Sequence, residues 1–214
     1  LTPYFQGDTD IPVCASKDAA AEIVKTRRNL PHWTKEGAIY WITFRLADSL
    51  PQEKLHAWKA ERDMWLAHHS KPWSEADWKE YDERFGERLE AWLDAGHGSC
   101  ALSRPDVRQI VQECLLRFDG ERLRLHAGVI MPNHVHLLAA FHLPTTCRGQ
   151  AKSWLHFTAF QINQELIRKG EFWQSEPFDH LVRSPEQYIY LRKYIADNGI
   201  KARLPPTDYL YWSR

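Results

Sequence analysis

The sequence predicts an α+β fold in which helices pack on one face of an antiparallel β-sheet. Strand-like segments are interspersed with segments whose apolar residues recur every three to four positions, and a tight turn joins two of the strand-like segments as a β-hairpin. The chain has 214 residues, of which 43% are hydrophobic, so it can build one large core but not two large domains. We therefore expect one domain over residues 1–214, with an inserted helical pair at about 51–97.

The first half of the chain predicts one strand followed by the helical pair. Residues 38–46, AIYWITFRL, are rich in β-branched and aromatic residues and predict a strand. One helix follows Pro51 up to the break at HHSKP, and Ser74 with Asp77 resembles a capping box that starts a second helix. The apolar residues of this second helix recur at helical spacing and predict a packed core rather than a platform for stacking bases: Trp78, Tyr81, Phe85, Leu89 and Trp92.

The second half predicts a third helix, a hairpin and two further helices. Pro105 opens the third helix, which FDGE closes. The hairpin pairs RLRLHAGVI with HVHLLAAF around the turn MPN. A fourth helix is expected at 150–169, a short strand at 178–183, and a last helix at about 185–198.

The charge distribution separates the helical pair from the C-terminal part. The net charge of zero argues against indiscriminate coating of nucleic acid, because that affinity comes from Lys and Arg neutralising phosphates. Residues 51–94 hold seven Lys and Arg against eleven Asp and Glu, whereas residues 148–203 hold nine against six. We expect a polyanion to bind the C-terminal part, and the functional chemistry to lie outside the acidic helices.

The cysteines and the apolar runs indicate a soluble, cytoplasmic protein. Four cysteines occur without a CxxC pair, which argues against a zinc ribbon or a disulfide scaffold. No apolar run is long enough to cross a bilayer, and the sequence starts without a signal-peptide pattern. The YFQG at residues 4–7 is compatible with a cleavage scar or with native sequence.

Two histidines lie one residue apart in the apolar run MPNHVHLL. On a strand, His134 and His136 project to one side while Val135 and Leu137 face the other, which is a geometry suited to a metal ion. Taken alone, the pair is also compatible with two satisfied core histidines. A third ligand must come from elsewhere, and the last helix offers Tyr194 and Asn198 four residues apart on one face.

These segments resemble a known family. MPNHVHLL, followed later by FWQSEPFDHLVRSPEQYIYLRKYIADNGIKARL, resembles the single-tyrosine HUH transposases, and most closely their REP-associated tyrosine transposase branch. The family's His-hydrophobe-His falls on residues 134–136, its tyrosine on Tyr194 and its polar metal ligand on Asn198. The family's segment W-Q…DH-x-x-R, which precedes this helix, is matched by Trp173, Gln174, Asp179, His180 and Arg183. The resemblance covers about residues 30–46 and 121–204, and Gly199 stands where the family usually has proline.

The resemblance implies a ferredoxin-like or RRM-like HUH fold and a DNA-processing enzyme. A divalent ion, Mg²⁺ or Mn²⁺, would be held by His134, His136 and Asn198, with Tyr194 as the nucleophile. The implied reaction is the nicking and rejoining of single-stranded DNA at hairpin-bearing, REP-like repeats through a 5′-phosphotyrosine intermediate. The implied protein is a monomer or homodimer in the bacterial cytoplasm, on the nucleoid. Residues expected at DNA phosphates are Lys152, Arg183, Arg192, Lys193, Lys201 and Arg203.

Several alternatives stay open at this level. Tyr190 is the main rival of Tyr194 for the nucleophile, because it lies on the same side of the helix, whereas Tyr188 faces away. His126 and His180 are either supporting partners of the site or plain core histidines. The chain could also be a catalytically inactive hairpin-DNA-binding protein of the same fold. A hydrolase that activates water with the histidine pair is less favoured, because no carboxylate stands out near the proposed ligands.

Overall fold

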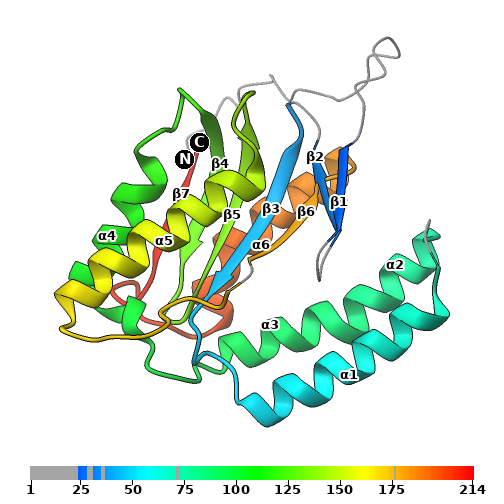
Figure 1. Ribbon diagram of the computed structural model, residues 1–214, viewed down its shortest axis with the longest axis horizontal. Helices are drawn as coiled ribbons and strands as arrows, with labels where there is room; N and C mark the ends of the chain where they lie inside the picture. Colours follow the sequence, from blue (N-terminus) through cyan, green and yellow to red (C-terminus); the bar gives the residue numbers. More distant parts are fainter. Residues whose placement is uncertain (1–23, 28–30, 35–36, 71–72, 176) are drawn as a thin grey trace, which may run out of the picture.

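A five-stranded antiparallel sheet forms the centre of the protein (Figure 1). The computed structural model describes residues 24–27, 31–34, 37–70, 73–175 and 177–214, so Cys14 and the YFQG segment lie outside the described residues. The strand order is β6-β3-β5-β4-β7, and a separate pair, β1-β2, forms a two-stranded sheet. The elements are β1 Val24–Arg27, β2 Pro31–Thr34, β3 Ile39–Arg45, α1 Gln52–His68, α2 Glu75–Tyr81, α3 Glu87–Asp94, α4 Pro105–Leu116, β4 Leu123–Ile130, β5 His134–Phe141, α5 Cys147–Glu165, β6 Phe178–Leu181, α6 Pro185–Lys201 and β7 Leu210–Ser213.

Both faces of this sheet are covered by helices. Val135 and Leu137 of β5 point into a core shared with α4 and α5, whereas Leu138 of the same strand packs against Leu191 and Ile195 of α6. Figure 1 shows α4 and α5 in front of the sheet and α6 behind it. The α+β class is confirmed, but the prediction that helices cover one face is wrong. Every residue of β5 is buried, so each face of the strand needs its own apolar cover.

The residues of α1, α2 and α3 form a helical arm with a core of its own. The arm comprises residues 52–94, and a single π-helical turn at Asp82–Gly86 joins α2 to α3. Its buried residues, together with Leu50 just before α1, form a cluster separate from the two sheet cores: Leu55, Trp58, Trp65, Phe85 and Leu93. The predicted capping box is confirmed, because Ser74 Oγ accepts from the Asp77 N–H at 3.1 Å while Asp77 Oδ2 accepts from the Ser74 N–H at 2.9 Å.

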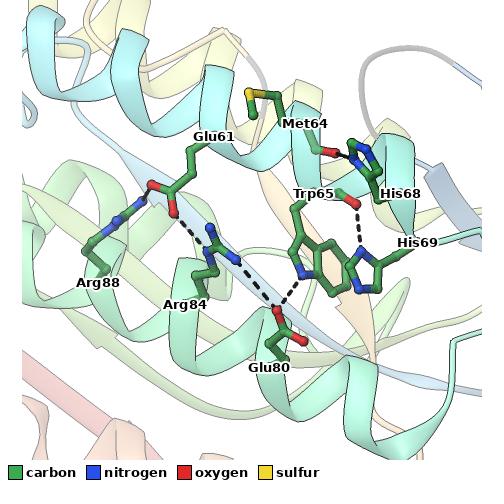
Figure 2. A network of polar contacts seen from close by, with 8 residues as sticks. All are labelled: Glu61, Met64, Trp65, His68, His69, Glu80, Arg84 and Arg88. Atoms are coloured by element: carbon green, nitrogen blue, oxygen red, sulfur yellow. Dashed lines mark hydrogen bonds and ion pairs between the residues drawn. The ribbon is translucent and has the colours of Figure 1, made fainter.

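Polar contacts tie α1 to the rest of the arm (Figure 2). Glu61 of α1 accepts hydrogen bonds from Arg84 at 2.8 Å and from Arg88 at 2.6 Å. Trp65 donates its indole N–H to Glu80 at 2.8 Å. Exposed ion pairs of this kind contribute at most about 1 kcal/mol each, so the apolar cluster supplies most of the arm's stability.

Some elements extend beyond the sequence-based expectations. The strand β7 pairs with β4 at the edge of the sheet and was not predicted, nor were β1 and β2. The last helix, α6, continues to Lys201. None of the helices in the described parts of the chain combines the length and apolar character needed to span a membrane.

Candidate metal centre

His134 and His136 lie side by side on the face of β5 that is turned toward α6. Their ring centroids are 4.6 Å apart, and neither residue has any exposed surface. Val135 and Leu137 belong to the core on the other face of the sheet, as the strand alternation predicts. Buried imidazoles cost free energy unless their nitrogens are satisfied, so the surroundings of each ring matter.

The hydrogen bonds behind the two imidazoles fix which nitrogen faces the site. Asn133 donates its amide N–H to the carbonyl of Leu93 at 3.0 Å, so its Oδ1 accepts a hydrogen bond from Nδ1 of His134 at 2.8 Å. The Nε2 atom of His134 is therefore left with a free lone pair. Nδ1 of His136 lies 2.9 Å from the hydroxyl of Thr43 on the neighbouring strand β3, an arrangement that orients ligand histidines in metal sites.

Glu90 of α3 completes a cluster with the two histidines. One ligand atom from each of Glu90, His134 and His136 lies within 4.8 Å of the others. A single carboxylate oxygen, Oε2, lies 3.0 Å from His136 Nε2 and also 3.0 Å from the hydroxyl of Tyr194. The expectation that the chemistry lies outside the acidic helices is therefore wrong, as is the view that no carboxylate accompanies the pair. The helical arm folds back so that its last helix reaches the sheet.

The last helix brings Tyr194 and Asn198 to the same place. Ser184 caps the helix by accepting from the N–H of Gln187 at 3.2 Å, and the four-residue spacing puts both side chains on one face. The Tyr194 ring packs edge-on against His136 and Trp41, with centroids 5.6 Å away in both cases. Asn198 is fully buried; its amide lies close to His134 and to the Tyr194 hydroxyl, but neither amide atom makes a hydrogen bond of good geometry.

Burial and mutual charge set the ionisation of the cluster. Burial raises the pKa of Glu90, but His136, His134 and the Tyr194 hydroxyl outweigh it and hold that pKa at about 2. Burial, assisted by His136, lowers the pKa of His134 to about 3. Burial and the charge of Glu90 raise the pKa of Tyr194 well above its ordinary value. At neutral pH the cluster thus holds a carboxylate, a neutral imidazole at His134 and an un-ionised phenol.

The donor set suits a divalent cation. Nε2 of His134 and both amide atoms of Asn198 are buried without a well-formed hydrogen bond, which is costly unless something satisfies them better. Imidazole nitrogens, a carboxylate oxygen and an amide oxygen together can bind Mn²⁺, Mg²⁺ or a later transition metal. Glu90 therefore joins the two histidines as a candidate ligand that the sequence-based set of two histidines and an amide lacked.

The rival tyrosines have other surroundings. The Tyr188 hydroxyl lies 3.0 Å from Nδ1 of His126, which is not a member of the cluster of Glu90, His134 and His136. Tyr190 is 57% exposed, and its ring centroid is 6.4 Å from that of Tyr194. Of the three tyrosines in α6, Tyr194 is the one with a recorded hydrogen bond to a member of the cluster. Burial lowers the pKa of His180 to about 4, and the centroid of its ring lies 6.5 Å from that of Trp41.

The expected DNA-binding residues are distributed over both faces of the sheet. Lys201 is closest to the cluster, with its ammonium group 4.6 Å from the centre of the Tyr194 ring. Arg192 donates to the carbonyl of Arg214 at 2.9 Å. Lys152 lies on α5, which packs on the opposite face of the sheet from His134. The remaining three are exposed residues at or beside α6: Arg183, Lys193 and Arg203.

Comparisons with known proteins give a likeness in structure but none in sequence. No family model matches the sequence, and no curated protein matches it. Among solved structures, a REP-associated tyrosine transposase bound to a REP hairpin is similar, with a TM-score of 0.46 and 13% identity. The match covers 88% of this chain and 92% of that chain. At this level of identity the likeness concerns the course of the backbone alone.

Proposed function

We propose that the chain nicks and rejoins single-stranded DNA in a metal-dependent reaction, with Tyr194 as the nucleophile. One observation carries the proposal: a buried cluster of two imidazoles, a carboxylate and an amide lies in hydrogen-bond contact with a tyrosine hydroxyl. Ordinary core histidines do not require a carboxylate from a distant helix. Nucleophile and supporting groups within hydrogen-bond reach of one another are the mark of covalent catalysis.

The residues divide into those that hold a cation and those that handle the phenol. His134, His136 and Asn198 would hold Mg²⁺ or Mn²⁺, with Glu90 as a further ligand until DNA enters, and such a cation would polarise a non-bridging phosphate oxygen. Glu90 Oε2, 3.0 Å from the Tyr194 hydroxyl, would accept the hydrogen bond of the phenol until the scissile phosphate takes its place, and the phenol proton would end on the departing 3′ oxygen. The packing of Trp41 against Tyr194 restrains the phenol ring and so would help to orient it for attack.

The covalent step conserves the phosphodiester energy. The Tyr194 oxygen forms a bond to phosphorus, and the bond from phosphorus to the 3′ oxygen breaks, so that one strand becomes attached as a 5′-phosphotyrosine and the other leaves with a 3′-OH. The reverse attack by a 3′-OH rejoins the strands without a nucleotide cofactor. We propose hairpin-bearing, REP-like repeats as the substrate, contacted by the basic residues of α6 and the segment after it.

The decisive experiment is covalent trapping on DNA. With Mn²⁺ and labelled hairpin oligonucleotides, the wild-type chain is expected to form a denaturant-resistant adduct, and Tyr194→Phe is expected to form none. Tyr190→Phe is the matched control, because this neighbouring tyrosine is exposed, and it should retain the adduct. An adduct that persists in Tyr194→Phe and disappears in Tyr190→Phe would overturn the assignment of the nucleophile.

Glu90 also supports a second candidate function. Two histidines and a carboxylate form the ligand set of many hydrolases in which a metal ion activates water. Cleavage of a phosphodiester that survives Tyr194→Phe, with no adduct in the wild-type chain, would favour this hydrolase. A third outcome, hairpin binding that is indifferent to chelator and accompanied by no cleavage, would favour the catalytically inactive DNA-binding protein.

A further inference from the structure

Arg45 lies beside the cluster of Glu90, His134 and His136 and has no role in the proposed function so far. It is the last residue of β3 and is paired directly with His134 across the β3-β5 ladder. Strand alternation places its side chain on the same face as Thr43, which contacts His136, and Trp41, which stacks on that ring at 4.7 Å. Side chains paired in this way have Cβ atoms about 5 Å apart. Arg45 therefore adjoins His134 on the face that carries the site.

The guanidinium of Arg45 is a half-buried cation without a bonded counter-ion. Its Nη1 is buried and makes no hydrogen bond, and no carboxylate in the described parts of the chain forms an ion pair with it. Burial lowers the pKa of Arg45 to about 10, and the nearby charge of Glu90 acts in the opposite direction. The group is thus charged at neutral pH. Burying an unpaired charge costs several kcal/mol unless an opposite charge compensates it, and the guanidinium geometry suits a phosphate in that role.

Glu90 occupies the position that such an anion would take. Its Oε2 is 3.0 Å from both the Tyr194 hydroxyl and Nε2 of His136, so the atom sits between the nucleophile and a metal ligand. His134, His136 and Asn198 have no exposed surface, so a phosphate that reaches them must displace this carboxylate. The incoming phosphate would replace one anion by another. It would also bring oxygen atoms in the paired arrangement that suits a guanidinium.

We propose that the scissile phosphate displaces Glu90 and is then bound by Arg45. The guanidinium of Arg45 stabilises the charge that develops during attack by Tyr194. The inference rests on the proposed function and adds to it a catalytic residue on β3. Lysine cannot fully replace arginine here, because an ammonium group lacks the two-pronged donor geometry. Removing one such donor in other enzymes lowers the rate by about 100-fold or more.

The matched control is Arg124. It lies on β4, paired with Ala140, on the same face of the sheet as the site. Ala140 is six residues along β5 from His134, which corresponds to about 20 Å. Arg124 is exposed, so Arg124→Gln removes the same charge from the same face without touching the cluster.

The test combines adduct formation with a neutral phosphate analogue. We expect Arg45→Gln to slow adduct formation with Mn²⁺ by about 100-fold, Arg45→Lys to fall between this variant and the wild type, and Arg124→Gln to change the rate less than about twofold. Binding is then measured in EDTA, in a Tyr194→Phe background, with DNA carrying either a normal phosphate or a methylphosphonate at the mapped cleavage position. Arg45→Gln should weaken binding of the normal DNA by about tenfold and leave binding of the methylphosphonate DNA unchanged.

The outcomes separate this inference from the proposed function. A wild-type chain that never forms an adduct overturns the proposed function, and the role of Arg45 with it. If the wild-type adduct forms, equal weakening of both DNAs by Arg45→Gln, or an adduct rate equal to that of Arg124→Gln, overturns the role of Arg45 alone. Thermal melting checks that Arg45→Gln is folded. If it is not, Arg45→Lys carries the same DNA comparison.

Discussion

Exchange of His126 for glutamine is expected to make the protein more resistant to acid. His126 is 8% exposed on β4, and its Nδ1 lies 3.0 Å from the Tyr188 hydroxyl. Burial, then the charges of Arg124 and Arg192, lower its pKa from 6.5 to about 4, although Asp119 acts in the opposite direction. Because the folded-state pKa is depressed, the unfolded chain takes up the proton first. The stability that depends on a neutral His126 is thus present above about pH 6.5 and is lost as the pH falls toward about 4.

The size of the effect follows from the two pKa values. With 6.5 in the unfolded chain and about 4 in the folded one, proton linkage removes about 2 kcal/mol at about pH 5 and under about 0.1 kcal/mol at about pH 7.5. Urea denaturation at both pH values should show wild type losing about 2 kcal/mol more than His126→Gln. The control is His142→Gln, because the side chain of His142 is exposed to water in the folded protein as in the unfolded chain. This variant should lose as much stability between the two pH values as wild type. A difference below about 0.5 kcal/mol between wild type and His126→Gln would refute the linkage argument.

Two further predictions concern the metal centre and the helix that supports it. Glu90→Gln removes the charged candidate ligand and should weaken Mn²⁺ binding at least about tenfold in calorimetric titration. Glu87→Gln, at an exposed position of the same helix, should leave the affinity for Mn²⁺ unchanged. Equal affinities of Glu90→Gln and wild type for Mn²⁺ would remove Glu90 from the ligand set. Gly199→Ala would drive a Cβ into the ring of Tyr209, so it should cost about 1–3 kcal/mol in thermal denaturation, and Tyr209→Ala should relieve most of this cost. No relief in the double variant would show that the contact is not the cause.

The sequence predicted the parts of the site that follow from local spacing. The two-residue alternation on a strand put His134 and His136 on one side, and the four-residue spacing on a helix put Tyr194 and Asn198 on one face. The structure brings these two pairs together. Their meeting depends on α6 covering the second face of the sheet. Alternation along β5 hinted at that second cover, because apolar Leu138 and Ala140 follow the histidines on the same side.

Glu90 and Arg45 were missed for a different reason. Each sits in an element whose own pattern has a complete local explanation: an acidic amphipathic helix for Glu90 and a buried strand for Arg45. Glu87, Glu90 and Asp94 recur at three-to-four spacing, which marks a line of acids along α3. The spacing does not say what the line faces. Only the long-range packing of the arm turns one of these acids toward the histidines, and a single sequence carries little information on such contacts.

Under the proposed function, the separate core of the helical arm would make admission of a DNA strand a distinct equilibrium from its cleavage. The imidazoles have no exposed surface and Glu90 of α3 lies against His136, so entry of a phosphodiester would require α3 to move away. Its apolar cluster is separate from the sheet cores, so the arm could move without breaking that cluster, and Gly96 and Gly98, with φ of 69° and 88°, follow α3. Each 1.4 kcal/mol needed for this opening lowers the apparent affinity for DNA about tenfold, so substitutions far from the cluster can tune target capture without altering the chemical step.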